Sequence, residues 1–323
     1  MVGDRAFWGA DRRGFLRLVG LSALGMAPSF GLAMRAPQAA VLPKEIVPGV
    51  HVHQGVHGFV EPANLGHIAN VGFILGEDAV AVIDSGGSAL QGQGLRAAIR
   101  ALTDRPIAYV IATHMHPDHL FGHAAFLEDE PTFVGHRKLP AALEQRGAFY
   151  LDNLRESLGN LADGTEVVMP DLLVDDVIEI DLGGRRLTLQ AHGTAHTDND
   201  LTVLDQANGL LFAGDLLFME RCPVLDGSLL GWVEVTASLA ELGAKTIVPG
   251  HGPVHASLPG ALEPQARYLA TLRSSVRAFL ADGGLLEDAV RALPFESERP
   301  HWALFDDTHG RNVNAAYVEL EWE

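Results

Sequence analysis

The stretch His114-Met115-His116-Pro117-Asp118-His119 places three imidazoles and a carboxylate within six residues. It follows residues 107–112 (Ile-Ala-Tyr-Val-Ile-Ala), an apolar run rich in β-branched and aromatic side chains that predicts a buried strand. The stretch therefore begins where a strand ends, on the loop that leaves the sheet. Imidazole nitrogens and carboxylate oxygens are the ligand types that suit zinc and other borderline divalent metals.

The spacing within this stretch predicts two neighbouring metal positions. His114 and His116 are two residues apart, so in an extended segment both side chains point the same way and can bind one ion. Pro117 then turns the chain, which directs Asp118 and His119 toward an adjacent position where a second ion would sit. The competing interpretation is a solvated histidine-rich loop in a chain that has 15 histidines.

Three further strand-like runs end near a ligand-type residue beside a glycine turn. Residues 186–190 precede His196, residues 210–212 precede Asp215, and residues 246–248 precede His251. Because the ends of neighbouring strands meet at one edge of a sheet, these side chains and the first stretch are expected to form one metal site.

The order of these motifs resembles that of the metallo-β-lactamase-fold hydrolases over residues 45–255, including an earlier strand that ends in Asp84-Ser85-Gly86. The resemblance implies an α/β fold, a four-layer αββα sandwich with the metal site at one sheet edge. It implies two metal positions that share one bridging carboxylate, and one further carboxylate that orients ligands without binding metal. The implied residues are His114, His116 and His196 on the first metal, Asp118, His119 and His251 on the second, Asp215 as the bridge, and Asp84 as the orienting carboxylate.

The chemistry that the resemblance implies is metal-assisted hydrolysis of an ester, thioester or amide. Two divalent ions, expected to be zinc with iron as the alternative, would share a hydroxide as the nucleophile. Asp118 would hold that nucleophile in line and shuttle its proton, which makes it the catalytic residue. Lactamase activity is expected to be weak, because Asp215, the helical insertion before His196 and the C-terminal extension depart from the true β-lactamases.

Two other classes of function stay open at this stage. The first is a mononuclear iron oxidoreductase similar to the persulfide dioxygenases, which oxygen uptake with a persulfide would reveal. The second is a non-catalytic accessory protein of a periplasmic dehydrogenase system. Alanine at Asp118 would abolish the function of an enzyme and leave an accessory role intact.

The N-terminus predicts export. Asp11-Arg12-Arg13-Gly14-Phe15-Leu16 resembles a bacterial twin-arginine signal, and the apolar stretch after it is too short and too weak for a stable membrane span. Residues 1–33 are therefore interpreted as a signal peptide and residues 34–46 as a tether, which gives a periplasmic protein with no membrane span in its mature form. The single cysteine, Cys222, excludes an intrachain disulfide and is expected to be a small buried hydrophobe.

The folded part is divided into a main domain, residues 47–260, and a helical extension, residues 261–323, packed on the same domain. Apolar residues between Leu262 and Leu280 recur at spacings of three and four, which predicts an amphipathic helix, and two shorter helices follow. The ending Asn312-Val313-Asn314-Ala315-Ala316-Tyr317 is similar to that of zinc metallohydrolases of quinoprotein relay systems and sulfur-oxidation clusters. Residues 195–200 and 214–218 are also similar to segments of that subgroup.

The substrate is expected to be a small molecule. A formal net charge of −18 argues against nucleic acid, whose backbone is bound by lysine and arginine clusters. Residues 50–57 suggest an edge strand running into a loop, and residues 137–162 suggest a helical insertion that roofs the active site. Candidates to line the pocket are His57 and Tyr150, followed by Glu61, Asn64, Phe149 and Arg146.

Overall fold

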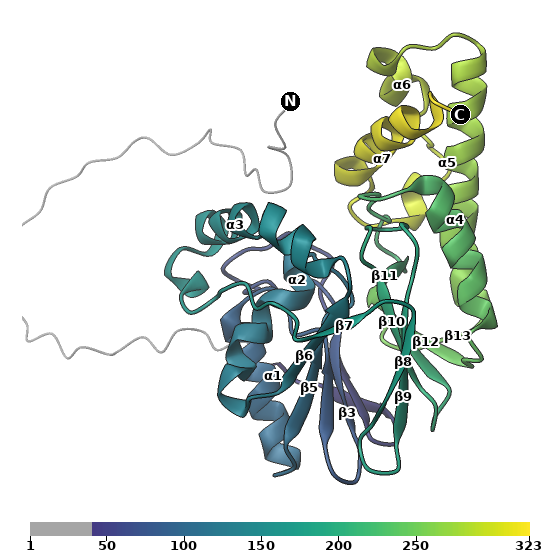
Figure 1. Ribbon diagram of the computed structural model, residues 1–323. Coiled ribbons are helices and arrows are strands. Elements are labelled where there is room, and N and C mark those ends of the chain that lie inside the picture. Colours follow the sequence, from purple (N-terminus) through teal and green to yellow (C-terminus); the bar gives the residue numbers. More distant parts are fainter. Residues whose placement is uncertain (1–40) are drawn as a thin grey trace, which may run out of the picture.

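The computed structural model describes residues 41–323 and contains two β-sheets that pack face to face (Figure 1). The first sheet has the order β1-β2-β3-β4-β5-β6-β7, antiparallel from β1 to β4 and parallel from β4 to β7. Its strands are β1 (Lys44–Val47), β2 (Val50–His53), β3 (Val71–Leu75), β4 (Val80–Ile83), β5 (Ile107–Ile111), β6 (Thr132–His136) and β7 (Leu172–Val174).

The second sheet has the order β13-β12-β11-β10-β9-β8 and is antiparallel except for the β11–β12 pair. Its longest strand, β11, is buried at all nine positions. The strands are β8 (Val177–Asp181), β9 (Arg186–Ala191), β10 (Leu201–Asp205), β11 (Leu210–Phe218), β12 (Thr246–His251) and β13 (Ala256–Ser257).

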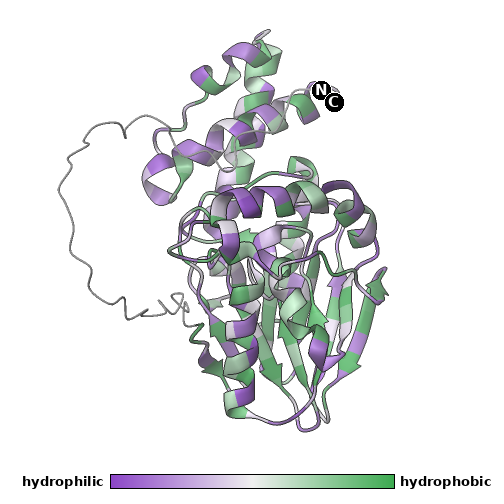
Figure 2. Ribbon diagram, turned by 90° about the vertical axis from the view of Figure 1, so that its left-hand side faces the viewer, coloured by the Kyte–Doolittle hydropathy of each residue, from purple (hydrophilic) through white to green (hydrophobic). Residues whose placement is uncertain are grey.

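The side chains along each strand point alternately to the two faces of its sheet, and this alternation explains the layers. In β4, Ala81 and Ile83 join the core between the two sheets, whereas Val80 and Val82 pack with helix α1 (Ala89–Leu102) on the outer face. Figure 2 shows the strands of the central layers mostly hydrophobic, whereas the helices mix hydrophobic and hydrophilic residues. The outer face of the second sheet is covered by α4 (Leu229–Ser238) and α5 (Glu263–Ala281). The predicted four-layer αββα sandwich is therefore confirmed.

Two helices lie near the end of the sheets from which the loops with the predicted metal ligands emerge (Figure 1). α2 (Pro117–Leu120) and a 3-10 helix (Phe121–Asp129) follow β5, and α3 (Leu139–Leu158) forms the predicted helical insertion. α5, α6 (Leu286–Ala292) and α7 (Phe305–Leu320) form the predicted C-terminal helices, and their apolar side chains share one core with β11 and α4. Between residues 41 and 323, no helix combines the length and apolar character that crossing a bilayer requires.

Two expectations about the N-terminal part differ from the structure. The predicted tether, residues 34–46, ends earlier than expected because Lys44–Val47 forms β1, whose partners lie on β2. For the same reason β2 is not an edge strand, since it lies between β1 and β3. The predicted signal peptide, residues 1–33, lies outside the described residues. Cys222 is fully buried, and burial raises the pKa of its thiol to about 12.

Candidate metal centre

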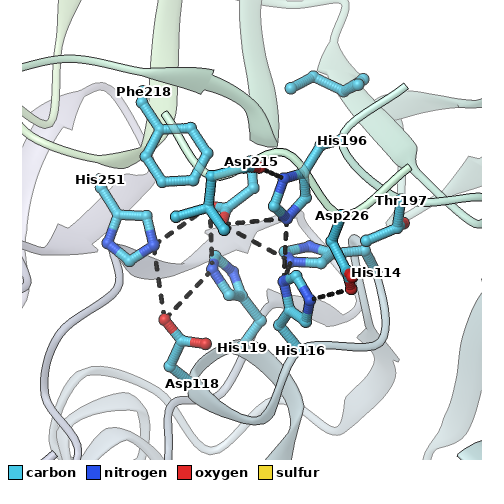
Figure 3. A network of polar contacts seen from close by, with 12 residues as sticks. His114, His116, Asp118, His119, His196, Thr197, Asp215, Phe218, Asp226 and His251 are labelled. Atoms are coloured by element: carbon cyan, nitrogen blue, oxygen red, sulfur yellow. Dashed lines mark hydrogen bonds and ion pairs between the residues drawn. The ribbon is translucent and has the colours of Figure 1, made fainter. Parts of the chain in front are cut away.

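All seven side chains predicted as metal ligands come together at one end of the sandwich (Figure 3). They lie after β5, in α2, after β9, in β11 and at the end of β12. Asp215 lies inside β11 rather than after it, and the pairing with β12 shifts at the preceding residue, Gly214, where φ is +51°. A side chain at position 214 would also meet Thr113 Oγ1 at 2.5 Å, so only glycine fits there.

The first group consists of His114, His116, His196 and Asp215. His116 Nδ1 lies 3.1 Å from His114 Nε2 and 2.9 Å from His196 Nε2. Asp215 Oδ2 lies 3.7 Å from His114 Nε2 and 3.4 Å from His196 Nε2. Three ring nitrogens and one carboxylate oxygen thus face a common point, as the ligands of a four-coordinate ion do.

The second group consists of Asp118, His119 and His251. Asp118 Oδ2 lies 3.9 Å from His119 Nε2 and 3.4 Å from His251 Nε2. The other oxygen of Asp215, Oδ1, lies 3.1 Å from His119 Nε2 and 3.3 Å from His251 Nε2. Asp215 therefore presents one oxygen to each group, which is the arrangement that a bridging carboxylate requires.

The polar atoms of this centre fit metal ions better than they fit one another. His119 Nε2 and Asp215 Oδ1 are close, yet both are buried without a hydrogen-bond partner, because each is directed toward the space between the ligands. Burial lowers the pKa of His114 well below its ordinary value and that of His196 to about 4, so both imidazoles are neutral and able to bind metal.

The charge balance of the second group also favours a bound cation. Burial disfavours a charge on His119, but the Asp215, Asp84 and Asp118 carboxylates raise its pKa well above the ordinary value. A site that draws a proton onto a buried imidazole is a site with excess negative charge. A divalent cation bound to the same nitrogen would neutralise that charge.

Each of the five histidines of this centre is held in orientation through its other ring nitrogen. His119 Nδ1 contacts Asp84 Oδ2 at 2.7 Å, and Asp84 also accepts hydrogen bonds from the backbone and hydroxyl of Thr113. His114 Nδ1 lies 3.1 Å from Thr113 Oγ1. Such contacts fix the tautomer and the ring orientation of a ligand. The other three are His196 Nδ1 to the Val224 carbonyl at 2.7 Å, His251 Nδ1 to the Ile68 carbonyl at 2.7 Å, and His116 Nε2 to Asp226 Oδ2 at 3.1 Å.

Asp226 is a residue of the centre that the sequence did not reveal. Its carboxylate contacts His116 and also accepts a hydrogen bond from Arg146 Nη1 of α3 at 2.5 Å. Those contacts hold its pKa below the ordinary range despite burial, so Asp226 is a carboxylate anion. Its only signal in the sequence is an Asp-Gly pair, which is typical of turns in general.

The pocket candidates have different positions. The Tyr150 ring lies 6.4 Å from the His116 ring, and its hydroxyl accepts a hydrogen bond from Arg146, so α3 borders the first group as expected. His57 is farther out, where its Nε2 lies 3.6 Å from Glu220 Oε2. Asn64 is a turn residue that binds the backbone of its own loop, and Phe149 is 46% exposed. Glu61 supplies backbone contacts to the same turn.

The C-terminal extension holds the loop that follows β11. Asn312 of α7 donates from Nδ2 to the Pro223 carbonyl at 2.6 Å and accepts from the Leu225 backbone N–H at 3.0 Å. Glu319 of α7 accepts hydrogen bonds from the first residues of α4. The loop between these contacts carries the Val224 carbonyl and Asp226, so α7 supports two ligand-orienting groups.

The chain is similar to known proteins over part of its length. It is 29% identical over 156 residues to Beta-lactamase-like protein 2 homolog of Caenorhabditis elegans. The matched region is 48% of this chain and 46% of the relative. It is also 33% identical over 64 residues to a linear primary-alkylsulfatase of a Pseudomonas strain, and this matched region is 20% of this chain and 12% of the relative. The chain thus spans less than half the length of these curated relatives.

Solved structures share the fold at low sequence identity. A metallo-beta-lactamase from Pontibacter korlensis matches 71% of this chain and 98% of its own, with a TM-score of 0.58 and 19% identity. A double mutant of the sec-alkyl sulfatase PisA1 matches 86% of this chain and 50% of its own, with a TM-score of 0.67 and 16% identity. The family model described as the Metallo-beta-lactamase superfamily matches residues 65–251, more than half of the sequence, and the chain therefore belongs to that superfamily.

Proposed function

We propose that this protein is a binuclear metal-dependent hydrolase that cleaves an ester, thioester or amide bond. The observation that carries the proposal is the position of Asp215, whose two oxygens each face one group of ligand-type side chains. A single metal site would not need the second group. Two divalent ions held there would lower the pKa of a bound water and polarise the substrate carbonyl.

The protein side chains supply orientation and proton transfer. Asp118 is 15% exposed, whereas His119, His251 and Asp215 are almost completely buried, so its carboxylate lies on the open side of the second group. From there it can hold an attacking water in line and accept its proton. Membership of the superfamily supports a hydrolase, and zinc fits the mixed imidazole and carboxylate ligands.

Metal content and activity test the proposal together. Protein purified without added metal is expected to contain two zinc ions per chain and to hydrolyse members of an ester, thioester and amide panel. Asp118→Ala is expected to lower kcat by about 10²- to 10⁴-fold, the range that proton transfer commonly contributes. Asp152→Ala, at an exposed position of α3, is the matched control and should keep full activity.

The other classes of function give different results in the same experiment. One iron per chain, with oxygen uptake on addition of a persulfide, would replace the hydrolase by an iron oxidoreductase. Full biological function in the Asp118→Ala variant would mean that the protein is not an enzyme but an accessory protein of a periplasmic dehydrogenase system. Sulfate esters belong in the panel because two of the similar proteins are alkylsulfatases.

Export through the twin-arginine route completes the proposal. Its support is the sequence Asp11-Arg12-Arg13-Gly14-Phe15-Leu16 and the apolar residues that follow it. Replacement of Arg12 and Arg13 together by lysine is expected to retain the protein in the cytoplasm, which cell fractionation measures. Periplasmic recovery of that variant at the wild-type level would contradict the proposal.

A further inference from the structure

Arg146 connects two parts of the protein that have separate hydrophobic cores. α3 packs in a cluster that includes Met115 of the stretch at residues 114–119. The loop after β11 packs, through Leu225, in the core that β11 shares with the C-terminal helices. Arg146 Nη1 of α3 donates a hydrogen bond of 2.5 Å to Asp226 Oδ2 of that loop. Within residues 41–323, this is the only side-chain hydrogen bond or ion pair between α3 and the loop.

The main chain at Asp226 is fixed, but its own loop leaves the side chain free. The Asp226 N–H donates to the His196 carbonyl at 3.1 Å, and the Ser228 N–H donates to the Ala195 carbonyl at 2.9 Å. A Cβ added at Gly227 would lie 2.5 Å from the Ala195 carbonyl oxygen, so the two segments are in close contact. None of these contacts involves the carboxylate, which still has a choice of staggered rotamers.

Two groups contact the Asp226 carboxylate, both at the same oxygen. Oδ2 lies 3.1 Å from His116 Nε2 and 2.5 Å from Arg146 Nη1 (Figure 3 shows the contact with His116). No other group of residues 41–323 donates a hydrogen bond to either oxygen. The side chain is 29% exposed, so water competes for it. The charged arginine provides a stronger hydrogen bond than a neutral donor does, and it therefore decides whether the carboxylate faces His116 or solvent.

The guanidinium reaches Asp226 from a well-supported position. Tyr150, one turn further along α3, accepts a hydrogen bond from Arg146 Nη1 at 3.4 Å and packs against the hydrophobic cluster below the helix. Next to Arg146, Gly147 brings α3 so near to Val167 that an added Cβ would lie 2.9 Å from Val167 Cγ2. Arg146 is thus held by its helix and is not a freely moving surface side chain.

We propose that Arg146 is a positioning residue for the first group of metal ligands. It holds Asp226 against His116 Nε2, and this contact directs His116 Nδ1 toward the Nε2 atoms of His114 and His196. The α3 insertion thereby becomes part of the first metal position, although no residue of α3 belongs to either ligand group. This inference rests on the proposed binuclear hydrolase and deepens it by assigning one more residue to that position.

Zinc affinity tests the proposal without a substrate, by competition between the metal-free protein and a chromophoric chelator. Arg146→Gln is expected to lower the affinity for one of two zinc ions by about 10-fold, the lower end of the range for residues that orient metal ligands, and to change the other by less than about 3-fold. Arg146→Lys should recover part of the loss, because lysine keeps the charge but not the planar donor geometry. Arg155→Gln, at a position of the same helix that is 62% exposed, is the matched control and should leave both affinities unchanged.

A double-mutant cycle tests whether Arg146 acts through Asp226. Asp226→Ala removes the carboxylate altogether, so Arg146→Gln should lower zinc affinity by less than about 2-fold in that background, because coupled residues are not additive. An undiminished loss in the Asp226→Ala background would overturn the proposal, since Arg146 would then affect the centre by another route, such as the general position of α3.

Activity at two zinc concentrations separates a positioning role from a substrate contact. With an ester that the wild type cleaves, Arg146→Gln is expected to lose activity at limiting zinc and to regain most of it at saturating zinc, with KM unchanged. A lowered kcat/KM that persists when both metal positions are filled would overturn the proposal, because Arg146 would then contact the substrate.

The affinity measurements also separate this inference from the proposed function. If Arg146→Gln weakens the binding of one zinc ion but the wild type cleaves no ester, thioester or amide, the positioning role stands and the hydrolase proposal fails. If Arg146→Gln binds both ions as tightly as the wild type does, the positioning role is overturned, whatever the wild type hydrolyses.

Discussion

Asp226 Oδ2 lies 3.1 Å from His116 Nε2, on the side of the imidazole that faces away from the ligand cluster. The Nδ1 atom of the same ring lies beside the Nε2 atoms of His114 and His196. A carboxylate in this position fixes the Nδ1 lone pair toward the metal position and makes the imidazole a stronger ligand. Asp226 comes from the loop after β11, so it links that loop directly to the stretch at residues 114–119.

Removing this carboxylate should weaken the first metal position more than the second. Asp226→Asn keeps the shape of the side chain but removes the charge that His116 and Arg146 contact. The affinity for one of two zinc ions is expected to fall by about 10- to 100-fold, as for other residues that orient metal ligands. Competition with a chromophoric chelator measures this. Asp198→Asn is the control, because within residues 41–323 the only hydrogen bond to that exposed carboxylate comes from its neighbour Asn199. Unchanged affinity for both ions would remove Asp226 from the centre.

Asn312 should connect the C-terminal extension to the metal centre. Asn312→Ala removes three hydrogen bonds inside the protein and leaves the Leu225 N–H and the Pro223 carbonyl without partners. The free energy of unfolding is expected to fall by about 2–3 kcal/mol, the cost of leaving buried polar groups unsatisfied. Zinc affinity should fall as well, because the released loop carries the carbonyl that orients His196.

The matched control for that variant is Asn314→Ala, on the exposed face of the same helix. Urea denaturation of the metal-free proteins measures stability, and chelator competition measures affinity. A loss of stability without any loss of zinc affinity would mean that α7 supports the fold but not the metal centre.

The parts of this site that could be predicted from the sequence are those set by local order along the chain. A strand followed by a polar turn places its last side chains at a sheet edge, which is why His114, His119, His196 and His251 could be assigned to one centre. Asp226 and Asn312 could not be found in this way. Asp226 meets His116 across 110 residues and Asn312 meets Leu225 across 87, and neither pair belongs to a periodic pattern. Their contacts depend on how α3 and α7 pack over the loop after β11.

The secondary structure shows the same contrast between elements set by local sequence pattern and elements set by tertiary contacts. The hydrophobic spacing predicted α5 because Leu269, Leu272 and Val276 pack against β11 and α4 on a single face. β1 was missed because only four residues form it and its burial pattern shows no buried position. Its stability comes from pairing with β2, which is a tertiary contact that the sequence of residues 44–47 does not encode by itself.

Metal removal should destabilise the protein. Without ions, His119 Nε2 and Asp215 Oδ1 are buried without hydrogen-bond partners, and the carboxylates of the centre repel one another. A ligand that binds only the folded state, at a free concentration of 100 times its dissociation constant, adds about 2.7 kcal/mol to the free energy of unfolding. For a domain of this size that corresponds to roughly 5–10 °C in Tm. A chelator is expected to lower Tm by that amount, and added zinc should restore it. In His114→Ala the chelator should have a smaller effect, and an equal effect would place the stabilising metal elsewhere.

The fold itself should show a pH-dependent contribution from Asp129, whose carboxylate pairs with two arginines of α1. Its carboxylate is 5% exposed and accepts hydrogen bonds from Arg96 and Arg100 of α1. Burial alone would raise its pKa, but the two guanidinium groups lower it below the ordinary value of 3.8. Because the folded pKa is depressed, the stabilisation is complete above about pH 4 and is lost as the pH falls through the folded pKa.

Asp129→Asn should therefore reduce the free energy of unfolding at pH 7 by about 1.5–3 kcal/mol, the range of hydrogen bonds to charged groups. The difference between variant and wild type should shrink below pH 4, where the wild-type carboxylate begins to be protonated. Urea denaturation of the metal-free proteins between pH 3 and 7 measures it. Asp152→Asn serves as the control, because its pair with Arg155 is 77% and 62% exposed and should contribute less than about 1 kcal/mol. A difference that is constant from pH 3 to 7 would show that Asp129 acts through its shape and not through its charge.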